Sequence, residues 1–224
     1  MIITIDGPAG SGKSSVAKNL AEKIGYIFFD SGAMYRAVTY GLIKEDIDPH
    51  NSELLSQFLQ NFNYSISSEA GEKIYHVNGE DVTQHIRSRI VTNRVSEIAA
   101  IAEVRNSLVH IQRNCAKDVN AVFEGRDMGT VVFPKAQLKV FLIASPRVRA
   151  ERRFNEIMAK NSEEAKALSL KQVEDDIIRR DHLDSTREHS PLREPENAKV
   201  IDTSNLSIAE VIKKIIDYKD EINK

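Results

Sequence analysis

The chain has 224 residues, of which 41% are hydrophobic and 29% charged, and its 31 basic and 33 acidic side chains give a formal net charge of −2. A chain of this length buries the core of one domain and leaves room for an inserted subdomain. The near-zero charge excludes a global basic excess of the kind that binds nucleic acid, although a local basic patch stays open. No run of about 18 apolar residues occurs, so we expect no membrane span.

Cysteine content and the first residues bear on the compartment. Cys115 is the single cysteine, so no internal disulfide can form and a reducing, cytoplasmic compartment is expected. Residues 1–6 lack the basic start and long apolar run of a signal peptide and favour a strand that begins at once. The six histidines show no metal-binding spacing.

The first thirty residues predict a strand, a glycine-rich loop, a helix and a second strand. Residues 2–5 are a short β-branched run followed by Gly-Pro, typical of a buried strand in a parallel sheet. After the loop, apolar residues recur with the helical period from Ala17 to Ile24, and Gly25 suits the end of that helix. Residues 26–29 favour the second strand.

The middle of the chain predicts helices around one antiparallel segment. Helices are expected over about 33–43, around 54–59 and over about 104–115. Residues 62–84 instead alternate between apolar and polar side chains, and Asn78-Gly79 is a hairpin turn signal. We therefore expect a small antiparallel insertion at about 62–84.

The last hundred residues return to alternating strands and helices. Strands are predicted at 121–123, 138–144 and 200–202. Helices are expected from Pro146, which suits a first helical turn, over 170–182, and after the capping box that Ser207 begins. Strands separated by helices predict an α/β fold with a doubly wound parallel sheet.

A phosphate-binding motif, Gly7-x-x-x-x-Gly12-Lys13-Ser14, lies between the first strand and the first helix. Glycines let the backbone wrap a phosphate with its N–H groups pointing inward, and the helix adds its positive end. Lys13 is expected to reach the β- and γ-phosphates, and the Ser14 hydroxyl to bind Mg²⁺. The residues expected at the donor nucleotide are Gly7, Pro8, Ala9, Gly10, Ser11, Gly12, Lys13, Ser14 and Ser15.

Other motifs narrow the class of P-loop protein. A GTPase would carry a guanine-reading Asn-Lys-x-Asp, which is absent. The strand that ends in an acid in ATPase motors has only a weak counterpart at residues 121–124. What remains is a small phosphotransferase with an acceptor site of its own. Asp30 and Glu124 are acids near the predicted site, and the sequence does not decide which one holds Mg²⁺ through water.

Five blocks of sequence carry a family resemblance. They are Ile5-Asp6-Gly7-Pro8-Ala9-Gly10-Ser11-Gly12-Lys13-Ser14, Asp30-Ser31-Gly32-Ala33-Met34-Tyr35-Arg36, Gly125-Arg126-Asp127-Met128-Gly129-Thr130-Val131-Val132-Phe133-Pro134, Arg180-Asp181-x-x-Asp184-Ser185-Thr186-Arg187 and Ile201-Asp202-Thr203. Together they resemble the bacterial cytidylate (CMP) kinases nearly from end to end. The second and third blocks are much more specific in combination than the first, which many NTPases share.

The resemblance implies an architecture and a reaction. The fold is that of a P-loop nucleoside monophosphate kinase, one domain over residues 1–224, with a monophosphate-binding subdomain at 31–105 and a helical lid at about 147–190. The reaction is phosphoryl transfer from ATP to CMP, and to dCMP, in a monomeric enzyme that needs Mg²⁺ and no nucleic acid or membrane partner. Two alternatives stay open at this point: a kinase for UMP or AMP, and a P-loop ATPase or switch that acts on a macromolecular partner.

Residue chemistry and the resemblance together define the acceptor site. Arginine suits the phosphate of a monophosphate because its fork is bidentate and permanently charged, and Arg36 and Arg126 follow predicted strand ends. Reading cytosine needs an acceptor for its amino group and donors for its N3 and O2. The residues expected at the acceptor are Ser31, Tyr35, Arg36, Ser96, Arg105, Gly125, Arg126, Asp127, Arg180, Asp184 and Arg187. Ser96 and Arg105 are supported by the resemblance alone, because their sequence context would place them on a helix surface. The resemblance is also the only support for Arg180, Asp184 and Arg187.

An arginine-rich stretch follows the strand at 138–144. The family places this stretch, with Arg147, Arg149, Arg152 and Arg153, in the lid that closes over ATP. Arg149 and Arg153 are four residues apart, so both can face the phosphates. With Lys13, Arg126 and Arg180 they are the expected catalytic residues. The polar segment 159–166 is given no catalytic role.

Overall fold

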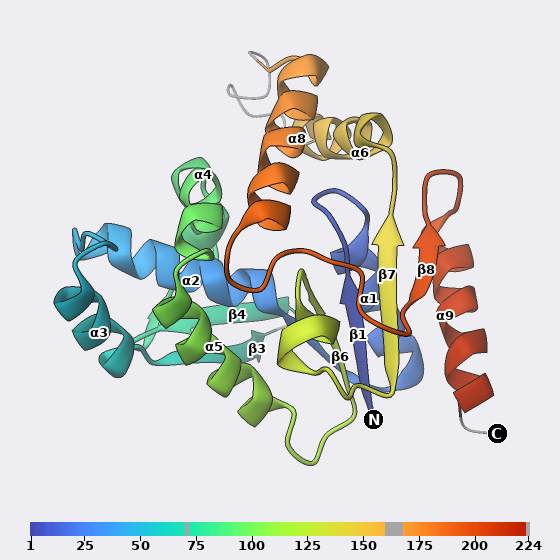
Figure 1. Cartoon of the computed structure of the whole chain (residues 1–224), viewed down its shortest axis with the longest axis horizontal. Helices are drawn as coiled ribbons and strands as arrows, with labels where there is room; N and C mark the ends of the chain where they lie inside the picture. Colours follow the sequence, from blue (N-terminus) through green and yellow to red (C-terminus); the bar gives the residue numbers. More distant parts are fainter. Residues whose placement is uncertain (70–71, 160–167, 223–224) are drawn as a thin grey trace. The chain divides into compact units, whose positions relative to one another are not determined.

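The computed structural model describes residues 1–69, 72–159 and 168–222, and it divides into two compact units (Figure 1). Unit 1 comprises Met1–Phe29 and Ala116–Lys224, and unit 2 comprises Asp30–Cys115. Parts of two predicted features lie outside the described residues: positions 70–71 of the insertion, and positions 160–167, which include nearly all of the polar segment at 159–166.

Unit 1 is built on a parallel sheet. Its described strands form one five-stranded sheet in the order β2-β6-β1-β7-β8. The strands are β1 (Ile2–Asp6), β2 (Ile27–Asp30), β6 (Ala121–Gly125), β7 (Leu138–Ile143) and β8 (Lys199–Asp202). β1 pairs in parallel with both β6 and β7, and β7 pairs in parallel with β8. The predicted α/β class and parallel sheet are therefore confirmed.

The two faces of β1 have different environments. Ile3 and Ile5 are fully buried in an apolar cluster with α1 (Lys13–Ile24) and α9 (Ile208–Ile222), which supply Leu20 and Ile215 among others. Because side chains alternate along a strand, Asp6 points to the opposite face. There its carboxylate meets η2 (Met128–Val132), a single π-helical turn that follows β6.

Two further helices of unit 1 follow β7 (Figure 1). α6 (Pro146–Ala159) and α8 (Leu170–Thr186) pack together through Ala150, Val173 and Ile177, which form a small buried cluster of their own. α8 begins with a capping box between Ser169 and Gln172. It also runs past the predicted end at residue 182, so Asp184 lies within this helix.

Unit 2 combines helices with the predicted antiparallel insertion. Its described helices are α2 (Ser31–Lys44), α3 (Ser52–Asn61), the short η1 (His85–Arg87), α4 (Arg89–Ile98) and α5 (Ala102–Cys115). Its antiparallel sheet consists of β3 (Tyr64–Glu69), β4 (Glu72–Val77) and β5 (Glu80–Asp81). Asn78 and Gly79 form the tight turn between the last two strands, with φ angles of 51° and 83°, as the Asn-Gly signal predicts.

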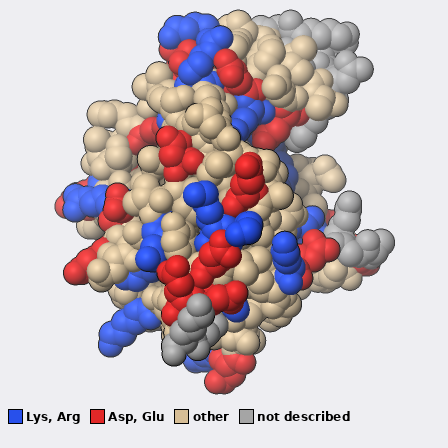
Figure 2. Space-filling model, turned by 90° about the vertical axis from the view of Figure 1, so that its right-hand side faces the viewer, with Lys and Arg blue, Asp and Glu red and all other residues tan. Residues whose placement is uncertain are grey.

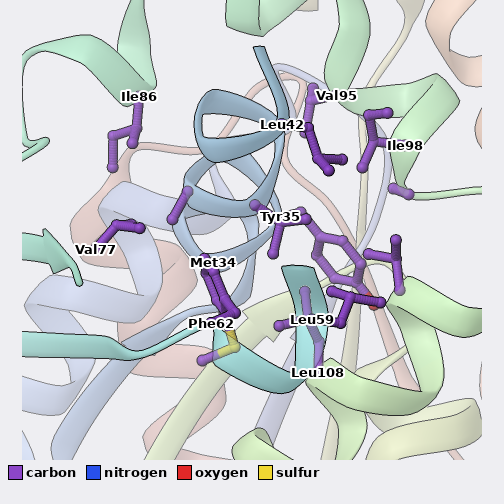
Figure 3. Close-up of a cluster of buried hydrophobic side chains, with 14 of the residues drawn as sticks. Met34, Tyr35, Leu42, Leu59, Phe62, Val77, Ile86, Val95, Ile98 and Leu108 are labelled. Carbon is purple, nitrogen blue, oxygen red and sulfur yellow. The ribbon is translucent and has the colours of Figure 1, made fainter. Parts of the chain in front are cut away.

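The core of unit 2 forms around α2. Figure 3 shows Tyr35 and Leu42 of α2 among Val95 and Ile98 of α4 and Leu108 of α5. All five side chains are buried. The core therefore fixes the position of α2, the helix that carries Ser31, Tyr35 and Arg36.

Several local features differ from the sequence expectations. Asp30 caps α2 by accepting a hydrogen bond from the Ala33 N–H at 2.9 Å, so the helix begins at Ser31 rather than Ala33. η2 has no helical apolar period and was not predicted. No bounds were predicted for α4, although Val91, Val95 and Ile98 recur along it at helical spacing. Arg105 is 3% exposed and not on a surface, because its helix is covered on the face that carries it. Cys115, the last residue of α5, is half-buried.

Charged groups alternate in sign over the surface. On the side shown in Figure 2, Lys and Arg side chains are interspersed with Asp and Glu. α9 carries two such neighbouring pairs, Lys213 with Asp217 and Lys219 with Asp220. Within the described residues, no helix has the length and apolar character to cross a bilayer, and no three His, Cys, Asp or Glu side chains are grouped to hold a metal.

Candidate active site

The glycine-rich loop joins β1 to α1 at the carboxyl edge of the parallel sheet. Gly7 has φ of +148°, and a Cβ there would lie 2.2 Å from the Leu142 carbonyl oxygen, so only glycine fits. Gly12 occupies the N-cap of α1 without a side-chain capping bond, and the first turn of α1 has no acidic residue. Because no side chain caps the first N–H groups of α1 and no acidic residue lies near them, this helix N-terminus is suited to bind an anion, as the motif predicts.

Lys13 is buried at the start of α1. Its Nζ donates a hydrogen bond to the Pro8 carbonyl at 2.7 Å. Burial, followed by the nearby cation of Arg126, lowers the pKa of Lys13 to about 7, although Glu124 opposes them. Glu124 and Asp6 only partly offset these effects, so the Lys13 ammonium group is suited to a further anionic partner such as a phosphate.

Two oxygen ligands lie side by side next to the loop. The Ser14 hydroxyl donates a hydrogen bond of 2.6 Å to Glu124 Oε1 at the end of β6. A hydroxyl and a carboxylate are the hard oxygen ligands that Mg²⁺ uses when phosphates complete its coordination. These residues therefore fit the expected metal ion.

A buried carboxylate behind the loop escaped the sequence reasoning. Asp6 is fully buried, and its two oxygens accept hydrogen bonds from the backbone N–H groups of Met128 at 2.9 Å and Gly129 at 2.7 Å. Asp6 is the residue before the loop, and Met128 follows Asp127, so this carboxylate connects the donor loop to the segment expected to read the base. Its place at a strand end was the available signal.

Asp6 leads to a prediction about stability and pH. Burial raises the pKa of Asp6 from 3.8 to about 7, despite the two backbone hydrogen bonds, which lower it. The folded chain therefore holds this proton more tightly than the unfolded chain, and the stability that results is lost as pH rises between these two pKa values. We expect Asp6→Asn to flatten this part of the pH dependence of the unfolding free energy.

Urea denaturation across that pH range measures the effect. Asp217→Asn, on the exposed face of α9, is the matched control and should leave the pH slope unchanged. Equal pH slopes in the unmodified protein and in Asp6→Asn would show that the Asp6 carboxyl titrates as it does in the unfolded chain.

A buried cluster of alternating charges lies between the end of β6 and α8. Arg126 Nε donates to Asp184 Oδ2 at 2.9 Å, and Arg187 lies 3.9 Å from both Asp184 and Asp127. Burial alone would raise the pKa of Asp184, but Arg126, Arg180 and Arg187 outweigh it and hold that pKa below its usual value. The structure thus brings together four of the residues predicted to bind the acceptor.

Arg180 stands out among the arginines of unit 1. Among the described residues, none accepts a hydrogen bond from its buried Nε. Burial, the Arg126 cation and, more weakly, the Arg153 cation together lower the pKa of Arg180 to about 10. Asp184 and Asp181 only partly offset these effects, so this half-buried positive charge is suited to an anionic ligand.

The arginines of α6 divide into buried and exposed ones. Arg149 is 4% exposed, and its guanidinium donates to the carbonyls of Ala144 and Ala9, both at 2.9 Å, and to Asp181. Arg153 is about half exposed and pairs with Glu156 at 3.1 Å. Although the two lie one turn apart, only Arg153 is left at the surface.

In unit 2 the structure places the remaining predicted residues. Arg105 lies over the ring of Tyr35, 5.2 Å from its centroid, and donates to the Ala99 carbonyl at 2.7 Å. Arg36 donates to Thr92 Oγ1 at 2.8 Å, one turn of α4 before the half-buried Ser96. Ser31 is buried as the first residue of α2.

The loop, the oxygen pair and the arginine-rich cluster define a P-loop phosphotransferase. The family model of cytidylate kinase matches residues 3–221 of this chain. The chain belongs to the cytidylate kinase family.

Two relatives agree with this assignment. The cytidylate kinase of Protochlamydia amoebophila (strain UWE25) is 53% identical over 222 residues, which cover 99% of this chain and 97% of that protein. The cytidylate kinase of Streptococcus pneumoniae (strain 70585) is 46% identical over 214 residues, covering 95% of this chain and 94% of that protein. The resemblance drawn from the five sequence blocks is therefore confirmed.

Proposed function

We propose that this protein transfers the γ-phosphoryl group of ATP to CMP, and to dCMP, giving CDP or dCDP and ADP in pyrimidine nucleotide metabolism. Family membership over nearly the whole chain supports CMP as the acceptor. The observation that carries the reaction type is the convergence of Lys13, Arg126 and Arg180: the two arginines lie close enough to help lower the pKa of Lys13, and Arg126 helps lower that of Arg180. Such a cluster suits a phosphoryl group that passes between two nucleotides.

The transfer is direct and in line. A phosphate oxygen of CMP attacks the γ-phosphorus, and the bond to the bridging oxygen of ADP breaks. That attacking oxygen is already anionic, so no general base is needed and no covalent enzyme intermediate forms. Lys13, Arg126, Arg153 and Arg180 neutralise charge on the transferring group, while closure of the lid at about 147–190 excludes water. Arg149 has a different role in this proposal, because its guanidinium is bound to backbone and Asp181.

We propose that Mg²⁺ binds together with ATP. Ser14 and Glu124 would hold it, and it would supply positive charge at the donor phosphates. Of the two acids that the sequence left open, Glu124 is the better candidate because it already contacts Ser14. Asp30 instead caps α2 and lies 3.6 Å from Arg87.

The proposed acceptor residues are those that the sequence and the resemblance predict. In unit 1 they are Gly125, Arg126, Asp127, Arg180, Asp184 and Arg187. In unit 2, within the subdomain at 31–105, they are Ser31, Tyr35, Arg36, Ser96 and Arg105. Charged and hydroxyl groups suit the phosphate, ribose and base edges of CMP. A monomer in the cytoplasm completes the proposal, and the single cysteine is consistent with that compartment.

A panel of acceptors tests the proposed reaction. ADP release from ATP is measured with CMP, dCMP, UMP and AMP, and without any acceptor. We expect CMP and dCMP to give the largest kcat/KM values and the acceptor-free rate to be small. A preference for UMP or AMP would show that the proposed acceptor is wrong. Rapid ATP hydrolysis without any monophosphate would instead favour a P-loop ATPase or switch.

Asp127 gives a sharper test of base recognition. Its carboxylate is buried and lies 3.9 Å from Arg187. Asp127→Ala should raise the KM for CMP about ten- to a hundredfold, the cost of losing a hydrogen bond to a charged group, and leave the KM for ATP nearly unchanged. Asp127→Asn keeps the size and one acceptor oxygen, so its defect should be smaller. Asp217→Ala on α9 is the control, and equal losses for both substrates would contradict the assignment.

A further inference from the structure

The side of the phosphate loop at Ala9 and Gly10 is in contact with α6. A Cβ on Gly10 would lie 3.0 Å from both the Cβ and the carbonyl oxygen of Arg149, so loop and helix pack backbone to backbone. Arg149 Nη1 donates to the Ala9 carbonyl at 2.9 Å, and its Nε donates to the Ala144 carbonyl at 2.9 Å. The arginine is therefore bound to the loop's own backbone.

Asp181 of α8 completes the contact from the other side. Its Oδ1 accepts a hydrogen bond of 3.2 Å from the Ala9 N–H, and its Oδ2 accepts from Arg149 Nη1. One ion pair therefore engages both the N–H and the carbonyl of the same loop residue. We call Ala9, Arg149 and Asp181 the Ala9 clamp.

A second contact of the same kind lies on the other side of Gly10. Thr203 Oγ1 donates to the Ser11 carbonyl at 3.2 Å, and Arg152 of α6 donates to both Thr203 Oγ1 and the Thr203 carbonyl. On one side of Gly10 an arginine of α6 thus bonds to the loop backbone directly, and on the other side a second arginine reaches it through Thr203. The repetition indicates that α6 shapes the loop.

Arg149 differs from the arginines that are suited to bind a ligand, because the protein itself supplies its partners. Its guanidinium already has two carbonyls and a carboxylate as partners. Arg180, in contrast, is half-buried near Arg126 and Arg153, and its buried Nε has no hydrogen-bond partner among the described residues. An anion placed at this site gains more from Arg180 than from Arg149.

We propose that Arg149 and Asp181 are positioning residues for the donor nucleotide, which hold the Ala9 peptide so that the loop binds the ATP phosphates in line with the acceptor. The proposal rests on the proposed function for its substrates but concerns donor binding alone. α8 also carries Arg180 and Asp184, so the same helix connects the loop to the acceptor-side cluster. The clamp therefore sets ATP affinity through the loop backbone and does not touch the phosphates.

The test compares single and double variants of the clamp. We expect Arg149→Ala and Asp181→Ala each to raise the KM for ATP, and the Kd for ADP, by about tenfold or more, since small misplacements of reacting groups are costly. The KM for CMP should stay within about threefold. The double variant should be no worse than the worse single variant, because either change opens the clamp. Lys213→Ala is the control: it removes an exposed cation of α9 that pairs with Asp217.

Other outcomes would overturn the proposal. If Arg149→Ala lowers kcat while Asp181→Ala behaves like Lys213→Ala, Arg149 acts directly on the phosphates. If both variants lower the melting temperature but leave ADP affinity unchanged, the pair is only structural.

Two measures keep the test decisive. Arg149→Lys and Asp181→Asn retain part of the clamp and replace any alanine variant that fails to fold, with a smaller loss of ADP affinity expected for each. Titration with ADP needs no acceptor, so it gives the same answer even if the acceptor is not CMP.

Discussion

Lys13→Ala is expected to lower turnover by about a thousandfold or more, because it removes a preorganised positive charge from the transferring phosphoryl group. Lys13 is buried at the start of α1, where burial and Arg126 hold its pKa near 7. Negative charge on ATP favours the protonated form of this side chain, so the interaction strengthens where charge develops. Initial rates of ADP release at saturating ATP and CMP measure the loss.

The control for this prediction lies on the same helix. Lys18 is exposed on α1, and Lys18→Ala should retain nearly full activity. Thermal unfolding of both variants separates catalysis from stability. Turnover in Lys13→Ala within about tenfold of the unmodified protein would sink the role assigned to this residue.

Arg126→Ala is expected to lower kcat/KM for CMP by about a hundredfold or more, because the half-buried guanidinium is central to the predicted acceptor site. The same change leaves Asp184 without its 2.9 Å partner, and removal of one member of a buried pair costs about 3–5 kcal/mol of folding free energy. Arg126→Lys keeps the charge but not the planar fork, so it should recover stability better than activity. Kinetics and urea denaturation of both variants check this.

The loss of folding stability in acid provides an independent measure of the Arg126–Asp184 ion pair. The pKa of Asp184 is held below its usual value, so this residue stabilises the fold at neutral pH and loses that contribution as pH falls through its folded pKa. Without Arg126 the carboxylate of Asp184 contributes less to stability at neutral pH. On acidification, the unfolding free energy of Arg126→Ala should therefore fall less than that of the unmodified protein. Arg126→Lys with wild-type kinetics for CMP would argue against phosphate recognition by a fork.

Much of the fold could be predicted because its signals are local. The strands at residues 2–5 and 121–123 are short apolar runs, and Asn78-Gly79 marks a turn that both residues adopt with positive φ. The strand order, with β1 between β6 and β7, depends on contacts between distant segments. The π-helical turn at Met128–Val132 is held by the carboxylate of Asp6, which lies more than 100 residues earlier in the chain. The sequence of residues 128–132 alone therefore does not predict this turn.

The candidate site divides in the same way. Family motifs pointed to Arg126, Asp127, Asp184 and Arg187, and the structure brings these four into one buried cluster. The roles of the individual residues stay predictions. Helical spacing placed Arg149 and Arg153 on one face of α6, but spacing does not say what that face meets. Arg149 is buried against the loop, whereas Arg153 stays exposed.

By itself the sequence determined the donor loop, the alternation of strands and helices, and the family. Each of these follows from contiguous residues: glycines that allow the loop, apolar periods that set the elements, and motifs a few residues long. Only the tertiary structure decided which arginines are bound by the protein itself and which remain for a ligand. That outcome depends on burial and on partners such as Ala9 and Asp181, which lie 172 residues apart in the chain and meet only after it folds.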